Sequence, residues 1–202
     1  MSAGTPSFVS AGARSPDTDR RWTPEELLRE HDDGQYELVD GRLVERHLGF
    51  ESSYIATILL TLLRQHVAEE GCGWVVGSEA GYQCFADDPN KVRKPDGAYV
   101  SFDRLPASDP PKGFCRVAPD LAFEVVSPHD LFSEVEVKVN DFLRAGVRLV
   151  WVVDPESRTV RVHRSEHVAY LKESDELTGG DVLPRFKCQV AELFQSPQAV
   201  SG

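Results

Sequence analysis

The sequence predicts a single domain of the α/β class, with an α+β arrangement in which helices flank a central mixed β-sheet. Two hairpins, around residues 36–46 and 147–164, supply strands, and residues 52–69 repeat apolar side chains at helical spacing. The expected order is helix, hairpin, long helix, several strands, helix, strand and strand. That order indicates a mixed sheet with helices packed on its faces.

The chain length and the character of its ends set the limits of this domain. The 202 residues can form one sizeable core and are too few for two ordinary domains. Residues 1–20 are small, polar and rich in Pro, Gly and Ser, so we expect a disordered tail there. The domain should span residues 21–195, with a flexible C-terminus over residues 196–202.

The first elements are an N-terminal helix and a β-hairpin. Thr23 is a good capping residue and Glu26 completes a capping box with it, so a helix should begin here. This short helix is expected to end near Asp33–Gly34. Apolar runs on both sides of Asp40–Gly41 then predict the first hairpin.

The middle of the chain carries the long helix and several strands. Gly71 ends the helix of residues 52–69, and the polar, Pro-rich residues 103–118 are typical of a surface loop. Strands are expected over residues 74–85, where Gly81 marks an irregularity, and over residues 96–102 and 121–126.

The last third of the chain contains a further helix followed by strands. Residues 133–145 favour a helix with Val135, Val139 and Phe142 on its buried face, although the alternation over residues 134–139 also fits a strand. Beyond it we expect strands over residues 147–153 and 159–164, then a peripheral strand and a short helix that reaches Leu193.

Composition excludes several classes of protein. No apolar run approaches the roughly 20 residues that a membrane span needs, and the N-terminus lacks the apolar stretch of a secretory signal. We therefore expect a cytoplasmic protein without membrane contact. The cysteines are scattered, with no C-x-x-C pair for zinc or redox chemistry, so reduced structural thiols are expected at Cys72, Cys84, Cys115 and Cys188.

The net charge of −11 argues against a general nucleic-acid coat protein, because phosphate contacts need Lys and Arg. A nuclease needs carboxylates for its metal ions and only a local basic rim. Lys91, Arg93 and Lys94 form a candidate rim for DNA contacts directly before Asp96. The alternative is that this short basic run is a solvated loop.

Glu124 and Asp96 are the carboxylates that the pattern singles out. Glu124 interrupts an otherwise apolar strand near its end, and burying an unpaired carboxylate costs several kcal/mol. Glu124 therefore needs a cationic partner or a cleft at the end of its strand. Asp96 opens another apolar strand. Two such carboxylates repel each other unless a cation lies between them, and their hard oxygens suit Mg²⁺ or Mn²⁺.

Lys138 could complete such a site, because it follows Glu124 on the next helix, at the flank of the apolar face. A lysine there can position an attacking water and stabilise charge on phosphoryl oxygens. The alternative is an ordinary ion pair with Glu134 or Asp141 on its own helix. Spacing alone favours neither interpretation.

The order of several motifs resembles the Uma2 family (DUF820), bacterial proteins of the restriction-endonuclease-like, PD-(D/E)XK nuclease superfamily. The resemblance spans roughly residues 23–194. It rests on five segments, Tyr36–Gly41 (YELVDG), Lys94–Asp96 (KPD), Ala118–Pro128 (APDLAFEVVSP), Lys138–Val147 and Leu149–Pro155 (LVWVVDP).

The resemblance implies a restriction-endonuclease-like core and a catalytic site of Asp96, Glu124 and Lys138 around Mg²⁺ or Mn²⁺. The backbone carbonyl of Val125 would be a further metal ligand. Two positions depart from the pattern. Val126 stands where the superfamily has its lysine, which this family takes from the following helix. Glu51–Ser52 stands where many relatives resemble Glu-His, so any role of that histidine is missing.

Other candidates are weaker. Glu37 could supply a third acidic group, although the solvent face of an alternating strand is the favoured interpretation, and Asp120 is expected to end a turn. His163 and His167 have helical zinc spacing but fall at a hairpin strand, so we expect a surface role. The sequence also lacks a dinucleotide fingerprint, a Walker loop and a nucleophile elbow.

These observations favour a Mg²⁺-dependent endonuclease that hydrolyses DNA phosphodiester bonds, acting as a homodimer because cutting both strands favours two-fold symmetry. A non-catalytic nuclease-fold protein that binds nucleic acid or protein remains an alternative, given the acidic charge and the displaced lysine. A hydrolase of small phosphodiesters is another.

Overall fold

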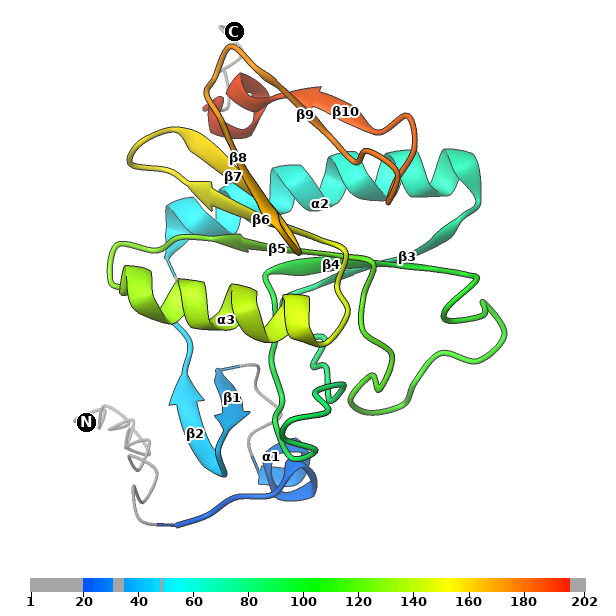
Figure 1. The fold of residues 1–202 in the computed structure, drawn as a ribbon, viewed down its shortest axis with the longest axis vertical. Coiled ribbons are helices and arrows are strands. Elements are labelled where there is room, and N and C mark those ends of the chain that lie inside the picture. Colours follow the sequence, from blue (N-terminus) through cyan, green and yellow to red (C-terminus); the bar gives the residue numbers. More distant parts are fainter. Residues whose placement is uncertain (1–19, 31–34, 48, 197–202) are drawn as a thin grey trace, which may run out of the picture.

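A six-stranded mixed sheet forms the centre of the protein (Figure 1). The computed structural model describes residues 20–30, 35–47 and 49–196. The strand order is β3-β4-β5-β6-β7-β8, in which β5 and β6 are parallel and all other neighbours are antiparallel. The strands are β3 (Gly73–Gly77), β4 (Gly97–Ser101), β5 (Leu121–Val125), β6 (Leu149–Asp154), β7 (Thr159–Arg164) and β8 (His167–Leu171). The predicted mixed sheet is confirmed.

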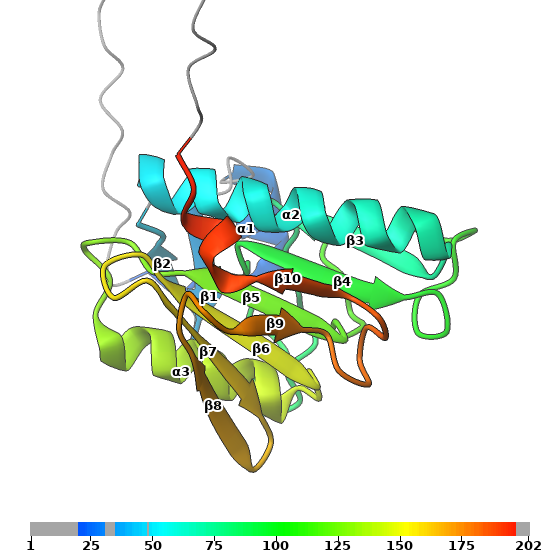
Figure 2. The same cartoon turned by 90° about the horizontal axis from the view of Figure 1, so that it is seen from above.

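Helices cover both faces of this sheet (Figure 2). On one face lie α2 (Phe50–Glu70) and the C-terminal elements β9 (Glu176–Thr178), β10 (Lys187–Gln189) and η1 (Val190–Phe194). On the other face lies α3 (Phe132–Arg144). The expected arrangement of helices on both faces is therefore present.

The alternation along β5 decides which face each of its side chains meets. Leu121, Phe123 and Val125 belong to the core cluster under α2, whereas Ala122 belongs to the cluster under α3. Because successive strand residues point to opposite faces, Glu124 is directed to the α3 side. An acidic side chain is thus placed beneath a helix.

A small hairpin lies below α3, beside α1 (Pro24–Glu30) (Figure 1). Its strands are β1 (Tyr36–Val39) and β2 (Arg42–Glu45), joined by Asp40 and Gly41 with φ of 49° and 71°. Both positive values fit the predicted two-residue turn. The Leu38 amide donates to the Val92 carbonyl at 2.9 Å and the reverse bond measures 2.8 Å, so the hairpin is joined to the segment before β4.

The capping box at the first helix is confirmed. The Glu26 amide donates to Thr23 Oγ1 at 3.2 Å, and the Thr23 amide donates to Glu26 Oε2 at 2.9 Å. The expected helix end near Asp33–Gly34 lies outside the described residues. So do most of the predicted N-terminal tail and of the C-terminal segment.

One strand prediction is wrong, and the favoured helix over residues 133–145 is confirmed. The strand expected over residues 74–85 ends at Gly77, and beyond it Tyr82 makes only isolated bridges, to Arg93 and Cys115. The alternative strand over residues 134–139 is a helix, because packing on the sheet selects the 3.6-residue repeat of its buried side chains. Within the described residues, no helix is long and apolar enough to cross a bilayer.

The close packing at Gly97 leads to a stability prediction. A Cβ at Gly97 would lie 2.4 Å from the Phe123 ring, whereas one at Gly77, its partner across β3 and β4, would meet only Leu60 at 3.5 Å. We expect Gly97→Ala to lower the free energy of unfolding by about 2 kcal/mol and Gly77→Ala to change it by less than about 0.5 kcal/mol. Urea unfolding of both variants measures this, and equal losses would contradict it.

Candidate active site

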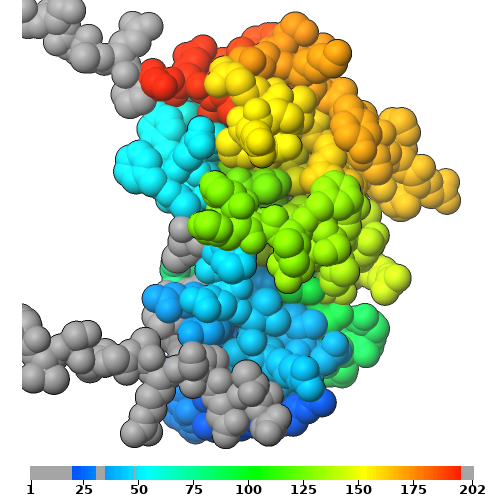
Figure 3. Space-filling model, turned by 90° about the vertical axis from the view of Figure 1, so that its left-hand side faces the viewer, coloured from blue at the N-terminus to red at the C-terminus, as the bar shows by residue number. Residues whose placement is uncertain are grey.

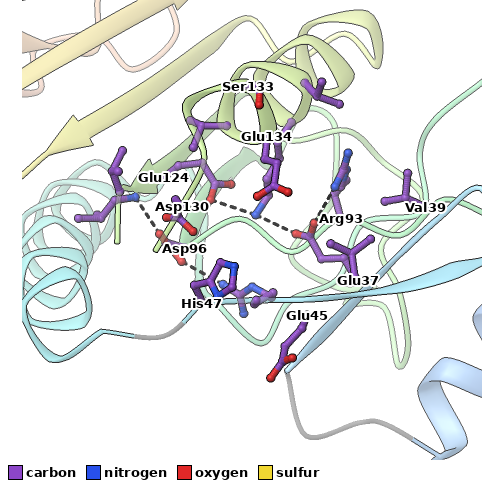
Figure 4. Close-up of a pocket in the computed structure, with 17 residues that line it drawn as sticks. Glu37, Val39, Glu45, His47, Arg93, Asp96, Glu124, Asp130, Ser133 and Glu134 are labelled. Carbon is purple, nitrogen blue, oxygen red and sulfur yellow. Dashed lines mark hydrogen bonds and ion pairs between the residues drawn. The ribbon is translucent and has the colours of Figure 1, made fainter. Parts of the chain in front are cut away.

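A cleft of about 330 Å³ opens between the hairpin, the end of β5 and the first turns of α3 (Figure 4). In the space-filling view, the β5–α3 segment (green) lies above the hairpin (blue) (Figure 3). Acidic side chains dominate the charged lining. The cleft is lined by Glu37, Glu45, Asp96, Glu124, Asp130, Glu134, three basic side chains (Arg46, Arg93, Lys138), His47, Ser133 and six valines (39, 44, 125, 126, 135, 137).

Glu124 is buried at the inner wall of this cleft. It is 8% exposed, and its Oε2 accepts a hydrogen bond from Lys138 Nζ at 3.0 Å. Its Oε1 is also buried and has no hydrogen-bond partner among the described residues. A buried carboxylate oxygen without a donor is costly, so this atom has unused capacity for a cation.

Lys138 connects two carboxylates from different parts of the fold. Its Nζ lies 3.0 Å from Glu124 Oε2 and 2.8 Å from Glu37 Oε1, and it donates to the Lys94 carbonyl at 2.9 Å. An ammonium group has three donors, and these contacts account for all of them. Within the described residues its ion pairs are with Glu37 and Glu124, so the interpretation as a pair along its own helix is wrong.

Glu37 lies inside the protein, not on the solvent face that the alternation favoured. It is 3% exposed, and besides Lys138 it accepts from Arg93 Nη1 at 2.9 Å and from the Lys94 amide at 2.7 Å. The hairpin docks with this face inward, which the alternation alone did not indicate. Glu37 thus belongs to the same cluster as Glu124.

Asp96 lies immediately before β4, beside the end of β5. Gly97 pairs with Phe123 in the antiparallel register, so the next residues along, Asp96 and Glu124, come opposite each other. Asp96 Oδ2 accepts from the Val125 amide at 2.8 Å, and its Oδ1 accepts from Arg46 Nη2 at 2.9 Å. The structure therefore brings together all three of the predicted catalytic side chains.

Arg46 is a site residue that the sequence reading did not single out. It follows β2, its side chain is 7% exposed, and it lines the cleft. As the last residue of the predicted hairpin it looked like an ordinary strand end. No local pattern distinguished it, because its contact with Asp96 depends on how the hairpin docks against the rest of the protein.

The basic run is not a surface rim. Lys91, Arg93 and Lys94 are 6%, 6% and 1% exposed. Lys91 Nζ lies 2.9 Å from Asp141 Oδ1, and Arg93 Nη2 lies 2.6 Å from Asp141 Oδ2. Lys91 and Arg93 thus compensate a carboxylate of α3 inside the protein, so the alternative of a solvated loop is wrong for these three side chains.

Burial and charge separate the two glutamates of the site. Burial raises the pKa of Glu124 to about 8, with the carboxylates of Asp96 and Glu37 adding to the effect and Lys138 opposing it. Burial also acts to raise the pKa of Glu37, but Lys138 and Arg93 outweigh it and hold that pKa near 2. Burial lowers the pKa of Lys138, yet the same two glutamates outweigh this and raise it above its usual value.

The oxygens of Asp96 and Glu124 fit a hard divalent cation. Glu124 Oε1 has no donor among the described residues. Asp96 Oδ1 accepts a hydrogen bond from the Arg46 side chain, not from the backbone. Mg²⁺ characteristically uses one or two carboxylates and keeps several waters. No group of three or more His, Cys, Asp and Glu side chains in the described ranges forms a complete metal-binding cluster. Asp96 and Glu124 therefore fit a Mg²⁺ site in which water molecules supply most of the ligands.

The remaining candidates have structural positions. His163 is buried on β7 and burial lowers its pKa, so the expected surface role is wrong for it, whereas His167 is exposed at the start of β8. Asp120 is buried and accepts from the Ser101 amide at 2.8 Å. All four cysteines are free thiols.

Comparison with known proteins identifies a family and solved structures with a similar fold. The family model Uma2, described as "Putative restriction endonuclease", matches residues 21–191. A crystal structure of "a putative nuclease belonging to DUF820" from Anabaena variabilis ATCC 29413 is similar in fold, with a TM-score of 0.74 and 17% sequence identity. The match covers 85% of this chain and 97% of that one. No curated protein matches the sequence significantly.

The raised pKa of Glu124 makes stability depend on pH. Between pH 4.5 and about 8 the folded protein keeps a proton that the unfolded chain has released, so this group makes stability fall as pH rises. We expect Glu124→Gln to remove that fall and to be more stable than wild type by on the order of 2 kcal/mol at pH 8, with little difference at pH 5. Urea unfolding at several pH values measures it.

The control for this experiment is Glu134→Gln, which removes one negative charge from the exposed part of the same cleft. It should leave the pH dependence of wild type in place. Parallel stability curves for wild type and Glu124→Gln would show that Glu124 does not hold a proton in the folded state.

Proposed function

This chain belongs to the Uma2 family, and we propose that it is a nuclease that hydrolyses DNA phosphodiester bonds with Mg²⁺ or Mn²⁺. One observation carries the proposal. Glu124 is a buried carboxylate with one oxygen on Lys138 and the other without a donor, opposite Asp96 at the end of two neighbouring strands. Ordinary ion pairing does not account for the second oxygen, whereas a bound cation would.

The proposed ligands of the cation are Asp96, Glu124 and the backbone carbonyl of Val125. A bound Mg²⁺ polarises a phosphoryl oxygen and lowers the pKa of a coordinated water. Val125 supports this assignment because its amide already orients Asp96, at 2.8 Å from Oδ2. Lys138 holds one oxygen of Glu124 and leaves Oε1 for the cation, whereas Asp96 is held through Oδ2 by the Val125 amide and through Oδ1 by Arg46.

The proposed role of Lys138 is to orient the attacking water and to stabilise negative charge on the phosphate. Glu37 is proposed as the positioning residue, since it holds the ammonium at 2.8 Å from the side opposite Glu124. The low pKa of Glu37 keeps it anionic, and this anion keeps Lys138 charged. Lys138 is then a fixed cation rather than a base that must lose its own proton first.

The acidic lining of the cleft makes the metal essential for substrate binding. Six carboxylates and three basic side chains line it, and the whole chain carries a net charge of −11. A phosphodiester would be repelled from this surface in the absence of additional positive charge. We therefore expect DNA to bind only when Mg²⁺ or Mn²⁺ is present.

Cleavage of supercoiled and linear DNA tests the proposal. With Mg²⁺ or Mn²⁺, wild type should cut, and Asp96→Asn, Glu124→Gln and Lys138→Met should each lose activity by at least about 100-fold. Each removes a charge or donor that the reaction needs, while the fold, followed by circular dichroism, should survive. Lys187→Met, on the far side of the sheet in β10, is the matched control and should cut normally.

The outcomes separate the alternatives. Metal binding without cleavage of any DNA would favour a nucleic-acid or protein-binding module. Cleavage of bis(p-nitrophenyl) phosphate but not of DNA would favour a hydrolase of small phosphodiesters. Normal cleavage by Lys138→Met alone would overturn only the role of that lysine.

We also propose that the protein acts as a homodimer, since a cut in both strands needs two sites. Apolar side chains at the starts of α2 and α3 support this, namely Phe50, Leu131 and Phe132, which are 92%, 60% and 67% exposed. Ser52 Oγ lies 2.8 Å from Ser127 Oγ, so the start of α2 lies beside the segment that leads from β5 into α3.

The expected mass in solution is therefore that of two chains, and Phe132→Ser should shift it toward one chain. Sedimentation equilibrium over a range of concentrations measures both. A wild-type monomer at all concentrations would contradict the dimer without affecting the assignment of the catalytic residues.

A further inference from the structure

We infer that Arg46 is a positioning residue that exchanges partners: it holds Asp96 when no metal ion is bound and a phosphate oxygen of the substrate when one is. The inference rests on the proposed function and extends it to a residue outside the Asp96, Glu124 and Lys138 set. It begins from the two arms of the guanidinium group.

One arm of Arg46 is fixed to the backbone and the other reaches the candidate metal ligand. Nη1 donates to the Ser78 carbonyl at 3.0 Å, and Nη2 donates to Asp96 Oδ1 at 2.9 Å. The side chain is 7% exposed and lines the cleft. The Ser78 contact can therefore keep the guanidinium in the cleft while the second arm changes its acceptor.

The two oxygens of Asp96 are held in different ways. Oδ2 accepts from the Val125 amide, which belongs to the rigid end of β5, whereas Oδ1 accepts from the Arg46 side chain. If Asp96 and Glu124 hold a cation, Oδ1 would be the oxygen that Asp96 offers more readily, because Oδ2 already accepts from a backbone amide. Arg46 Nη2 and a divalent cation thus compete for the same atom.

Arg46 and Lys138 both interact with Asp96, Arg46 through a hydrogen bond and Lys138 through its charge, and they differ in whether a donor can change its acceptor. Lys138 meets three acceptors, Glu37, Glu124 and the Lys94 carbonyl, which match its three donors. Arg46 gives up an acceptor when the cation takes Oδ1. The guanidinium group that has lost its contact with Asp96 can then bond a phosphate oxygen, because its planar set of donors matches the geometry of a phosphate group.

Partner exchange predicts opposite effects on two affinities. Without the guanidinium, Asp96 is available to the metal ion, so metal binding should strengthen, whereas phosphate binding in the metal-loaded protein should weaken. A guanidinium with a purely structural role would support both affinities or neither. The opposite signs therefore exclude a purely structural role for the guanidinium.

The test uses calorimetric titration of the full chain with Mn²⁺, then with thymidine 5′-monophosphate at saturating Mn²⁺. This nucleotide has a phosphate but no phosphodiester bond to cleave. For Arg46→Met we expect Mn²⁺ affinity to rise about tenfold, because a competing cation is removed. We expect affinity for the nucleotide to fall about tenfold, because a charge-assisted contact to phosphate is lost.

Two further variants complete the design. Arg46→Gln keeps a donor for the Ser78 carbonyl without the charge, so it should reproduce both shifts, and it replaces Arg46→Met if that variant does not fold. Arg42→Met removes an exposed arginine of the same hairpin and should change neither affinity.

Unchanged or weaker Mn²⁺ binding in both Arg46 variants overturns the inference, as does an unchanged affinity for the nucleotide. If wild type binds Mn²⁺ and cuts DNA in that case, the proposed function stands and only the exchange fails. If wild type binds no Mn²⁺, the metal-dependent function fails and the exchange fails with it.

Discussion

The contact between one ammonium group and two buried carboxylates connects the parts of this protein that are far apart in sequence. Lys138 comes from α3, Glu124 from the central strand β5 and Glu37 from the N-terminal hairpin. Glu37 stays ionised, and removing one partner of its buried ion pair with Lys138 costs about 3–5 kcal/mol, because the other charge stays buried. The hairpin, the helix and the sheet must therefore keep their relative positions, and the cleft between them keeps its shape.

A second group of buried ion pairs surrounds the contact of Lys138 with its two glutamates. Asp141 lies on α3 three residues beyond Lys138, and it accepts from Lys91 and Arg93 in the segment that leads into β4. Arg93 also bonds Glu37, so the same guanidinium joins the helix to the hairpin. The net charge of −11 gives no indication of this pairing, because it counts the whole chain, whereas in the interior each of these carboxylates contacts a cation.

Local patterns in the sequence predicted the mixed sheet and singled out Glu124, whereas the place of Lys138 beside Glu124 followed from the resemblance to the Uma2 family. A glutamate inside an apolar strand is a strong signal, as is the helical spacing that follows it. The burial of Glu37 and of the basic run was not predictable in this way, since it depends on the long-range contact of Leu38 with Val92. Alternation along a strand tells which side chains share a face, but not which face docks against the rest of the protein. Arg46 was missed for the same reason.

The position of the lysine follows from the geometry of β5. Residues 124 and 126 point to the same face, so a lysine two residues after the glutamate would also be directed toward α3. Here that position is Val126, which packs against the apolar cluster under the helix. The ammonium is supplied instead from α3 itself and reaches Glu124 from above the sheet. The site thus requires a cation within about 3 Å of the strand glutamate. A lysine on a helix packed against the strand can supply it, provided that a second anion such as Glu37 holds the lysine side chain in place.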